Sequence, residues 1–172
     1  MPGARWFQGA RLNFAENLLR HRDDATALVF RGEDGHQRRL SYKALFEQAG
    51  ALASALQAQG IGTGDRVAAI LPNCPEAVIG MLATSWLGAV WSSCSPDFGA
   101  DGILDRFSQI RPSLLIATTG YHFKGRAIDI RAKVDQVLNL MDTYTGPEHL
   151  LDVPEALDAM LQPIPIPDAY VL

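Results

Sequence analysis

The sequence predicts an α/β fold, with a parallel βαβ core, flanking helices and a preceding β-hairpin. Two short apolar runs, at residues 66–71 and 114–118, carry almost no polar alternation. Strands of this kind have both faces of their sheet covered by helices. A third strand is predicted at 89–94, and each gap between the strands has room for one crossover helix. Right-handed connections between parallel strands are therefore expected.

End signals mark the helices of this core. Pro75 occupies a first helical turn, where a missing N–H costs nothing, and Glu76 follows at the positive end of the helix dipole. Gly88 is expected to end the same helix. A second helix is predicted after the strand at 89–94, with the side chain of Ser95 or Asp97 as its cap.

Residues 1–24 form the first predicted unit, an extended segment followed by a short helix. Asn13 and Glu16 have the spacing of a capping box, which begins that helix. Residues 25–141 form the predicted α/β core. It opens with T-A-L-V-F-R and H-Q-R-R-L around the turn residues G-E-D-G, a pattern that predicts a β-hairpin.

A long helix is predicted after the hairpin. Ser41 caps it, leucines and alanines at helical spacing mark its buried face, and Gly60 ends it. The glycine-rich run at 60–65 then leaves a helix and enters a strand, whereas a dinucleotide-binding loop leaves a strand and opens a helix. We interpret this run as a turn. Neither G-x-x-x-x-G-K-[ST] nor G-x-S-x-G occurs in the sequence.

The core is predicted to close with a loop at 119–126 and an amphipathic helix that runs to about Leu140. Residues 142–172 are interpreted as a divergent, proline-rich tail, because P-I-P-I-P-D is too rich in proline for a central strand. Within it, residues 162–172 are expected to form a tail or an edge segment.

Composition excludes several classes of function. A net charge of -4 without a basic block argues against nucleic acid as a principal partner. The N-terminus lacks the apolar core of a signal peptide, and the longest apolar run is too short to span a bilayer. Cys74 and Cys94 are interpreted as buried small hydrophobes, and the 4 histidines lack metal-ligand spacing. We predict a cytoplasmic protein with no membrane partner and no metal site.

Ligands of an open parallel sheet bind outside the carboxyl ends of its strands. The loop at 92–99 offers hydroxyls, a carboxylate and an aromatic ring, although capping a helix would use the same residues. The loop at 119–126 sets Lys124 and Arg126 beside two aromatic rings, which suits a phosphate and a base. A solvated loop would contain similar residues, so both interpretations stay open.

Several segments, in matching order, resemble the N-terminal part of the AMP-forming acyl-CoA synthetases, the adenylate-forming superfamily. They are W-F-Q-G-A-R-L-N-F-A-E-N-L-L-R, L-S-Y-K-A-L, G-D-R-V-A-A-I-L-P-N-C-P-E-A-V-I-G-M-L-A and W-S-S-C-S-P-D-F-G. The last segment resembles the acetoacetate-CoA ligase branch. The resemblance covers roughly residues 5–140 and implies a partial N-terminal domain of an adenylate-forming enzyme, with 25–141 as part of its AMP-binding domain.

The resemblance implies a ligase reaction in two steps. ATP and acetoacetate give an acyl-adenylate and diphosphate with the help of Mg²⁺, and CoA then takes the acyl group and releases AMP. The phosphate loop, the ribose-binding acidic motif and the C-terminal lysine of the family come later in the chain, and this sequence contains none of them. We therefore expect an inactive fragment, which can self-associate through an unpaired sheet edge. The alternative is a free-standing, non-catalytic α/β module that binds a nucleotide or a protein.

In related acetyl-CoA synthetases, two loops lie against the nucleotide part of CoA. Arg126 matches one of the two arginines that hold the 3′-phosphate there. Phe123 stands where the other would be, and Lys124 can supply a compensating charge. No catalytic residue and no metal ligand is assigned to this sequence. The CoA contacts that the resemblance implies are Ser95, Pro96, Asp97, Phe123, Lys124, Gly125 and Arg126.

Overall fold

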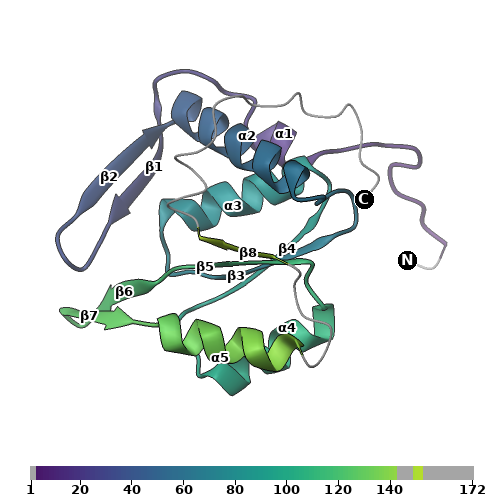
Figure 1. The fold of residues 1–172 in the computed structure, drawn as a ribbon. Coiled ribbons are helices and arrows are strands. Elements are labelled where there is room, and N and C mark those ends of the chain that lie inside the picture. The colour runs from purple at the N-terminus through teal and green to yellow at the C-terminus, as the bar shows by residue number, and fades with distance from the viewer. Residues whose placement is uncertain (1–2, 143–148, 153–172) are drawn as a thin grey trace.

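A four-stranded parallel sheet lies between two layers of helices in this computed structural model (Figure 1). The structure describes residues 3–142 and 149–152. Every neighbouring pair in the strand order β4-β3-β5-β8 is parallel, as the apolar runs predicted. The strands are β3 (Arg66–Ile70), β4 (Val90–Cys94), β5 (Leu114–Ala117) and β8 (His149–Asp152).

Two helices cover each face of the sheet, and a short helix packs beside one of these layers (Figure 1). One layer holds α2 (Tyr42–Ala58) and α3 (Pro75–Trp86), with α1 (Phe14–Leu18) against α3. The other holds α4 (Ala100–Ile110) and α5 (Arg131–Asp142).

Alternate residues of the central strands belong to opposite layers of the core. Val67 and Ala69 of β3 pack in the cluster that includes α2 and α3, whereas Ala68 and Ile70 pack in the cluster that includes α4 and α5. Side chains alternate between the two faces of a strand, so a strand covered on both faces carries apolar residues throughout. This packing confirms the α/β fold with helices on both faces.

Two antiparallel hairpins project from the sheet layers. The predicted first hairpin is confirmed as β1 (Thr26–Arg31) with β2 (Gln37–Ser41). The predicted loop at 119–126 is wrong, because β6 (Gly120–Phe123) and β7 (Arg126–Asp129) form a second hairpin there. Lys124 and Gly125 make its turn with φ values of 51° and 72°. Two consecutive positive φ angles suit the tight turns that match the twist of a hairpin.

Most predicted helix ends are confirmed. The side chains of Asn13 and Ser41 accept backbone N–H groups of α1 and α2, and Pro75 lies in the first turn of α3. The predicted cap of α4 is wrong. That helix follows Gly99 and has no side-chain cap, because Ser95 and Asp97 lie farther upstream and hydrogen-bond elsewhere.

A strand occupies part of the segment that the sequence suggested was a proline-rich tail. β8 pairs in parallel with β5, from His149 beside Leu114 to Asp152 beside Ala117. The nearby prolines lie at 147 and 154 and leave this short segment free to join the sheet. The prediction for residues 162–172 lies outside the described residues. No helix in the described part of the chain is long and apolar enough to cross a bilayer.

Candidate functional site

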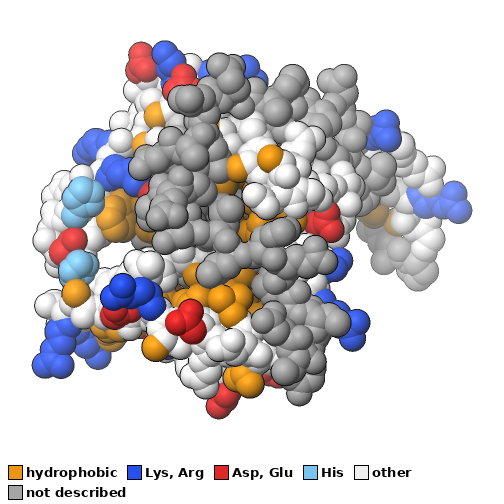
Figure 2. Space-filling model, viewed as in Figure 1, with side chains coloured by type: hydrophobic (Ala, Val, Ile, Leu, Met, Phe, Trp, Pro, Cys, Tyr) orange, Lys and Arg blue, Asp and Glu red, His pale blue; other side chains and the backbone are white. Residues whose placement is uncertain are grey.

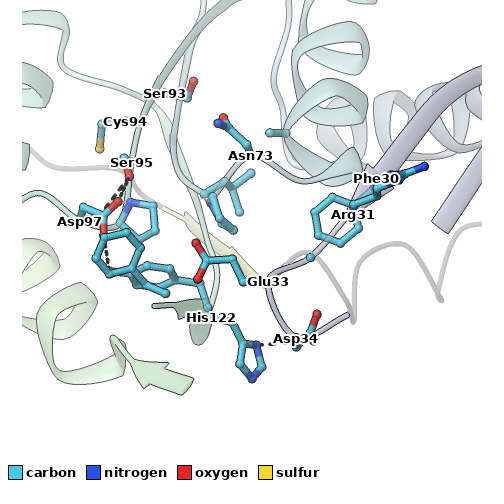
Figure 3. A pocket seen from close by; sticks show the side chains of 17 residues that line it. Phe30, Arg31, Glu33, Asp34, Asn73, Ser93, Cys94, Ser95, Asp97 and His122 are labelled. Atoms are coloured by element: carbon cyan, nitrogen blue, oxygen red, sulfur yellow. Dashed lines mark hydrogen bonds and ion pairs between the residues drawn. The ribbon is translucent and has the colours of Figure 1, made fainter. Parts of the chain in front are cut away.

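A pocket of about 590 Å³ opens beyond the carboxyl ends of β3 and β4. The segments that follow these strands line it together with the tip of the β1–β2 hairpin and strand β6 (Figure 3). The chain leaves β3 toward the α2–α3 layer and leaves β5 toward the α4–α5 layer (Figure 1). Open α/β sheets bind ligands in a crevice at such a divergence, and this pocket lies at the strand ends where the sequence directed the search for a site.

The loop after β4 is a closed turn that is held by its own side chains. Ser95 Oγ donates to Asp97 Oδ2 at 2.9 Å, and the Asp97 backbone N–H donates back to Ser95 Oγ at 3.3 Å (Figure 3). Ser95, Pro96 and Asp97 all line the pocket. Ser95 and Asp97 therefore give this side of the pocket a polar wall.

This loop is joined to the second hairpin, which carries the other CoA contacts that the resemblance predicts. Tyr121 Oη donates to Asp97 Oδ1 at 2.6 Å. Hydrogen bonds from Tyr121 and then Ser95 hold the pKa of Asp97 below its ordinary value. The same bond to Asp97 raises the pKa of Tyr121 to about 12. Asp97 thus accepts as a carboxylate and Tyr121 donates as a phenol at neutral pH.

The remaining predicted contacts divide between the pocket and the hairpin tip. Phe123 lines the pocket, whereas Lys124, Gly125 and Arg126 are exposed and lie beyond its lining. Lys124 Nζ lies 5.0 Å from the centroid of the Phe123 ring, within cation–π range. Neither Lys124 nor Arg126 forms a salt bridge with a described carboxylate. Figure 2 shows basic side chains gathered at the outer end of this hairpin.

Acidic groups dominate the pocket itself. Three carboxylates line it, those of Glu33, Asp34 and Asp97. The basic side chains of the lining are Arg31 and, when protonated, His122. The Nδ1 atom of His122 lies 3.7 Å from Asp34 Oδ2 and links the two hairpins (Figure 3). A phosphate is repelled by carboxylates and attracted by free cations. The hairpin tip is therefore the better phosphate site, and the pocket suits an uncharged, hydrogen-bonding group.

Cysteine chemistry plays no part in this site. Cys94 lines the pocket and Cys74 follows β3. Burial raises the pKa of each thiol to about 11. Because the thiolate is the reactive form, a raised pKa keeps both residues in the less reactive thiol form at neutral pH. Cys94 is buried, as the sequence predicted, whereas Cys74 is only half-buried. In the described ranges, no group of three or more His, Cys, Asp and Glu side chains could hold a metal ion.

The sequence did not indicate several residues of the site. Glu33 and Asp34 belong to the turn of the first hairpin, and no local pattern shows that this turn reaches a strand end far along the chain. Lys133 Nζ donates to the Pro96 carbonyl at 2.7 Å from helix α5. Its position at the start of an amphipathic helix was visible, but its partner was not.

Residues 14–165 match the family described as AMP-binding enzymes. The chain belongs to this family. Its sequence is 55% identical over 145 residues to the acetoacetyl-coenzyme A synthetase of Rhizobium meliloti (strain 1021), covering 84% of this chain and 22% of that protein. It is 42% identical over 123 residues to the acetoacetyl-CoA synthetase of Xenopus tropicalis, covering 70% of this chain and 18% of that protein.

Among solved structures, this AMP-binding chain is similar to the acetoacetyl-CoA synthetase from Streptomyces lividans. The TM-score is 0.84 at 38% sequence identity, over 95% of this chain and 28% of that one. The resemblance inferred from the sequence motifs is therefore confirmed for both family and fold. The chain spans 22% of the Rhizobium meliloti relative, so it corresponds to a part of such a protein.

Proposed function

We propose that this chain is the N-terminal part of a cytoplasmic, AMP-forming acyl-CoA ligase. The proposed reaction converts acetoacetate, CoA and ATP into acetoacetyl-CoA, AMP and diphosphate. The names of the similar proteins support the acetoacetate assignment. Mg²⁺ would accompany ATP in that reaction. The described residues hold no cluster that fits it, so we assign them no step that involves the metal.

Within this ligase, the chain contributes contacts to the nucleotide part of CoA. The observation that carries this proposal is the hydrogen bond from Tyr121 to Asp97, which joins the two loops that the family resemblance singles out. The joined loops place a polar pocket wall beside a hairpin tip whose two cations form no salt bridge with a described carboxylate. A nucleotide with a 3′-phosphate needs both kinds of surface.

Arg126 is the proposed ligand of the 3′-phosphate, with Lys124 as a second cation. A guanidinium offers paired donors in a plane, which match two oxygens of a phosphate. A hydrogen bond to a charged group contributes about 1.5 to 3 kcal/mol. Arg126→Ala should therefore weaken CoA binding by roughly 10-fold or more, since 1.4 kcal/mol is a factor of ten.

The test compares CoA with dephospho-CoA, which lacks the 3′-phosphate, by calorimetric titration of the 172-residue chain. The wild-type chain should prefer CoA, and Arg126→Ala should abolish the preference. Arg111→Gly is the control, because it removes an exposed cation just before β5, away from the carboxyl ends of the strands, and suits the φ of 47° there. A preference that survives Arg126→Ala would refute the assignment. A wild-type chain with no preference would favour a non-catalytic module.

The chain alone should not catalyse the adenylation step. Transfer of the adenylyl group from ATP to acetoacetate, with diphosphate leaving, needs donors and cations that offset the charge of the triphosphate, and the sequence lacks a phosphate-binding loop to provide them. Acetoacetate-dependent exchange of labelled diphosphate into ATP should equal that of a heat-killed control. Exchange above that control would show that this segment carries catalytic machinery.

A further inference from the structure

The loop at 95–97 is held by side chains from two other elements. Tyr121 of β6 donates to its Asp97 carboxylate at 2.6 Å. Lys133 of α5 donates to its Pro96 carbonyl at 2.7 Å. The two donors act on neighbouring residues of one short loop. The loop is therefore fixed both to the second hairpin and to the helical layer beneath it.

The donors themselves sit on well-supported elements. Helix α5 buries Val134 and Val137 in the core, next to the half-buried Lys133. The ring of Tyr121 packs against the same core cluster. Adjacent side chains of a strand point to opposite faces. The next residue of β6, His122, accordingly faces Asp34 of the first hairpin instead.

We propose that Tyr121 and Lys133 are positioning residues that lock the 95–97 loop against the β6–β7 hairpin and thereby present Arg126 to the 3′-phosphate of CoA. This inference rests on the proposed function, which it deepens. Neither residue needs to touch the phosphate. Their contribution is to hold the hairpin, and hence its basic tip, in one place before the ligand arrives, which lowers the entropic cost of binding.

The chemistry of the Tyr121 bond suits this role. A phenol that donates to a carboxylate makes a short, charge-assisted hydrogen bond. Asp97 also faces Ser95 and the charges of Lys133 and Lys124, all of which favour its ionised form. Because its pKa is lowered, the bond is complete at neutral pH and is lost only as the pH falls through that lowered value. Tyr121 releases its proton only near pH 12.

The first experiment tests the hydrogen bond from Tyr121 to Asp97 without any ligand. Carbon-detected NMR on the 172-residue chain follows the Asp97 carboxyl through an acid titration. Tyr121→Phe keeps the packed ring and removes the donor, so the pKa of Asp97 should rise toward its ordinary value. Tyr42→Phe is the matched control on α2 and should leave that pKa unchanged. An unchanged Asp97 pKa in Tyr121→Phe would show that Tyr121 does not hold the 95–97 loop through this hydrogen bond.

The second experiment is a double-mutant cycle on CoA affinity in the same chain. Tyr121→Phe should raise the Kd for CoA by about tenfold and leave the Kd for dephospho-CoA nearly unchanged, because dephospho-CoA lacks the 3′-phosphate. In the Arg126→Ala background it should change neither Kd much further, because Tyr121 acts through Arg126. Additive effects would show that Tyr121 does not act through the tip. Lys133→Met, which keeps the apolar stem, should behave in the same way.

The two experiments separate the two claims. Equal affinity of the wild-type chain for CoA and dephospho-CoA would overturn both the 3′-phosphate assignment and the positioning role. The Asp97 titration would then still decide whether the hydrogen bond exists in solution. A raised Asp97 pKa with an intact preference for CoA in Tyr121→Phe would overturn the positioning role and leave Arg126 as the phosphate ligand.

Discussion

At the scale of single residues, burial decides what the two thiols can do. Cys94 lies at a strand end beside the pocket, where a nucleophile would be well placed. Burial raises its pKa, and that of Cys74, to about 11, against an ordinary 9.0. Nearby cations at Arg106 and Lys133 favour the Cys94 thiolate, but desolvation outweighs them. Position alone therefore does not make a reactive cysteine.

Alkylation by iodoacetamide measures this directly. At pH 7.5, both thiols of the folded chain should react far more slowly than free cysteine, because the thiolate is the nucleophile. Folding should also lose stability as the pH rises from 9.0 toward about 11, since the unfolded thiols ionise first. Below pH 9.0 the thiols are protonated in both states and add no pH dependence. Rapid labelling of the native chain at neutral pH would contradict these values.

Residue spacing in the sequence predicted some roles and misassigned others. Asn13 was predicted as a helix cap, and its buried side chain also donates to the carbonyls of Ser85 and Trp86 at the end of α3. A local capping pattern identifies the first role, whereas the second joins residues more than 70 positions apart. Asp97 failed as a cap because helix α4 begins only after Gly99, and its carboxylate accepts from Tyr121 of β6 instead.

At the scale of elements, the approach of α3 to the sheet depends on a glycine. A Cβ atom on Gly80 would lie 2.6 Å from the ring of Trp91 on β4. The helix therefore lies against this ring only because position 80 has no side chain. Crowding of this kind in a packed region costs about 1 to 3 kcal/mol.

Gly80→Ala should thus lower the free energy of unfolding by that amount less the roughly 0.5 to 1 kcal/mol that alanine gains over glycine inside a helix, measured by urea denaturation. Gly102→Ala on α4 is the control, because its Cβ would meet only Phe98 at an ordinary 3.8 Å. Alanine is favoured over glycine inside a helix by roughly 0.5 to 1 kcal/mol, so this control should be neutral or stabilising. Equal stability of the two variants would contradict the claim that the Trp91 contact limits the size of residue 80.

Elements with strong periodicity were predictable, and short polar strands were not. β3 and β5 stand out because both faces are buried, so every residue after Arg66, which begins β3, is apolar. β6 and β7 lie at the surface and mix aromatic, charged and small residues, which gives no period. Their turn at Lys124 and Gly125 was the available signal, since glycine in such a pair favours a tight hairpin. β8 is only His149–Asp152 and sits between prolines in the sequence.

At the scale of the whole molecule, topology placed the site but not its contacts. The rule that ligands bind beyond the carboxyl ends of parallel strands selected the loops after β3, β4 and β5. The structure brings the second and third of these together through Tyr121 and Asp97 and adds the turn of the first hairpin. Those contacts depend on how separate hairpins dock, which no local sequence pattern encodes.

The central claim is that this chain supplies the N-terminal part of an acetoacetate-activating ligase. The most direct measurement is made on a chimera, in which residues of this chain replace the matching N-terminal segment of the Rhizobium meliloti relative, 55% identical to it. CoA- and acetoacetate-dependent release of AMP should persist, and Arg126→Ala should raise the KM for CoA while leaving the KM for ATP unchanged. A folded chimera that releases no AMP would contradict the account. So would a chimera in which Arg126→Ala leaves the KM for CoA unchanged.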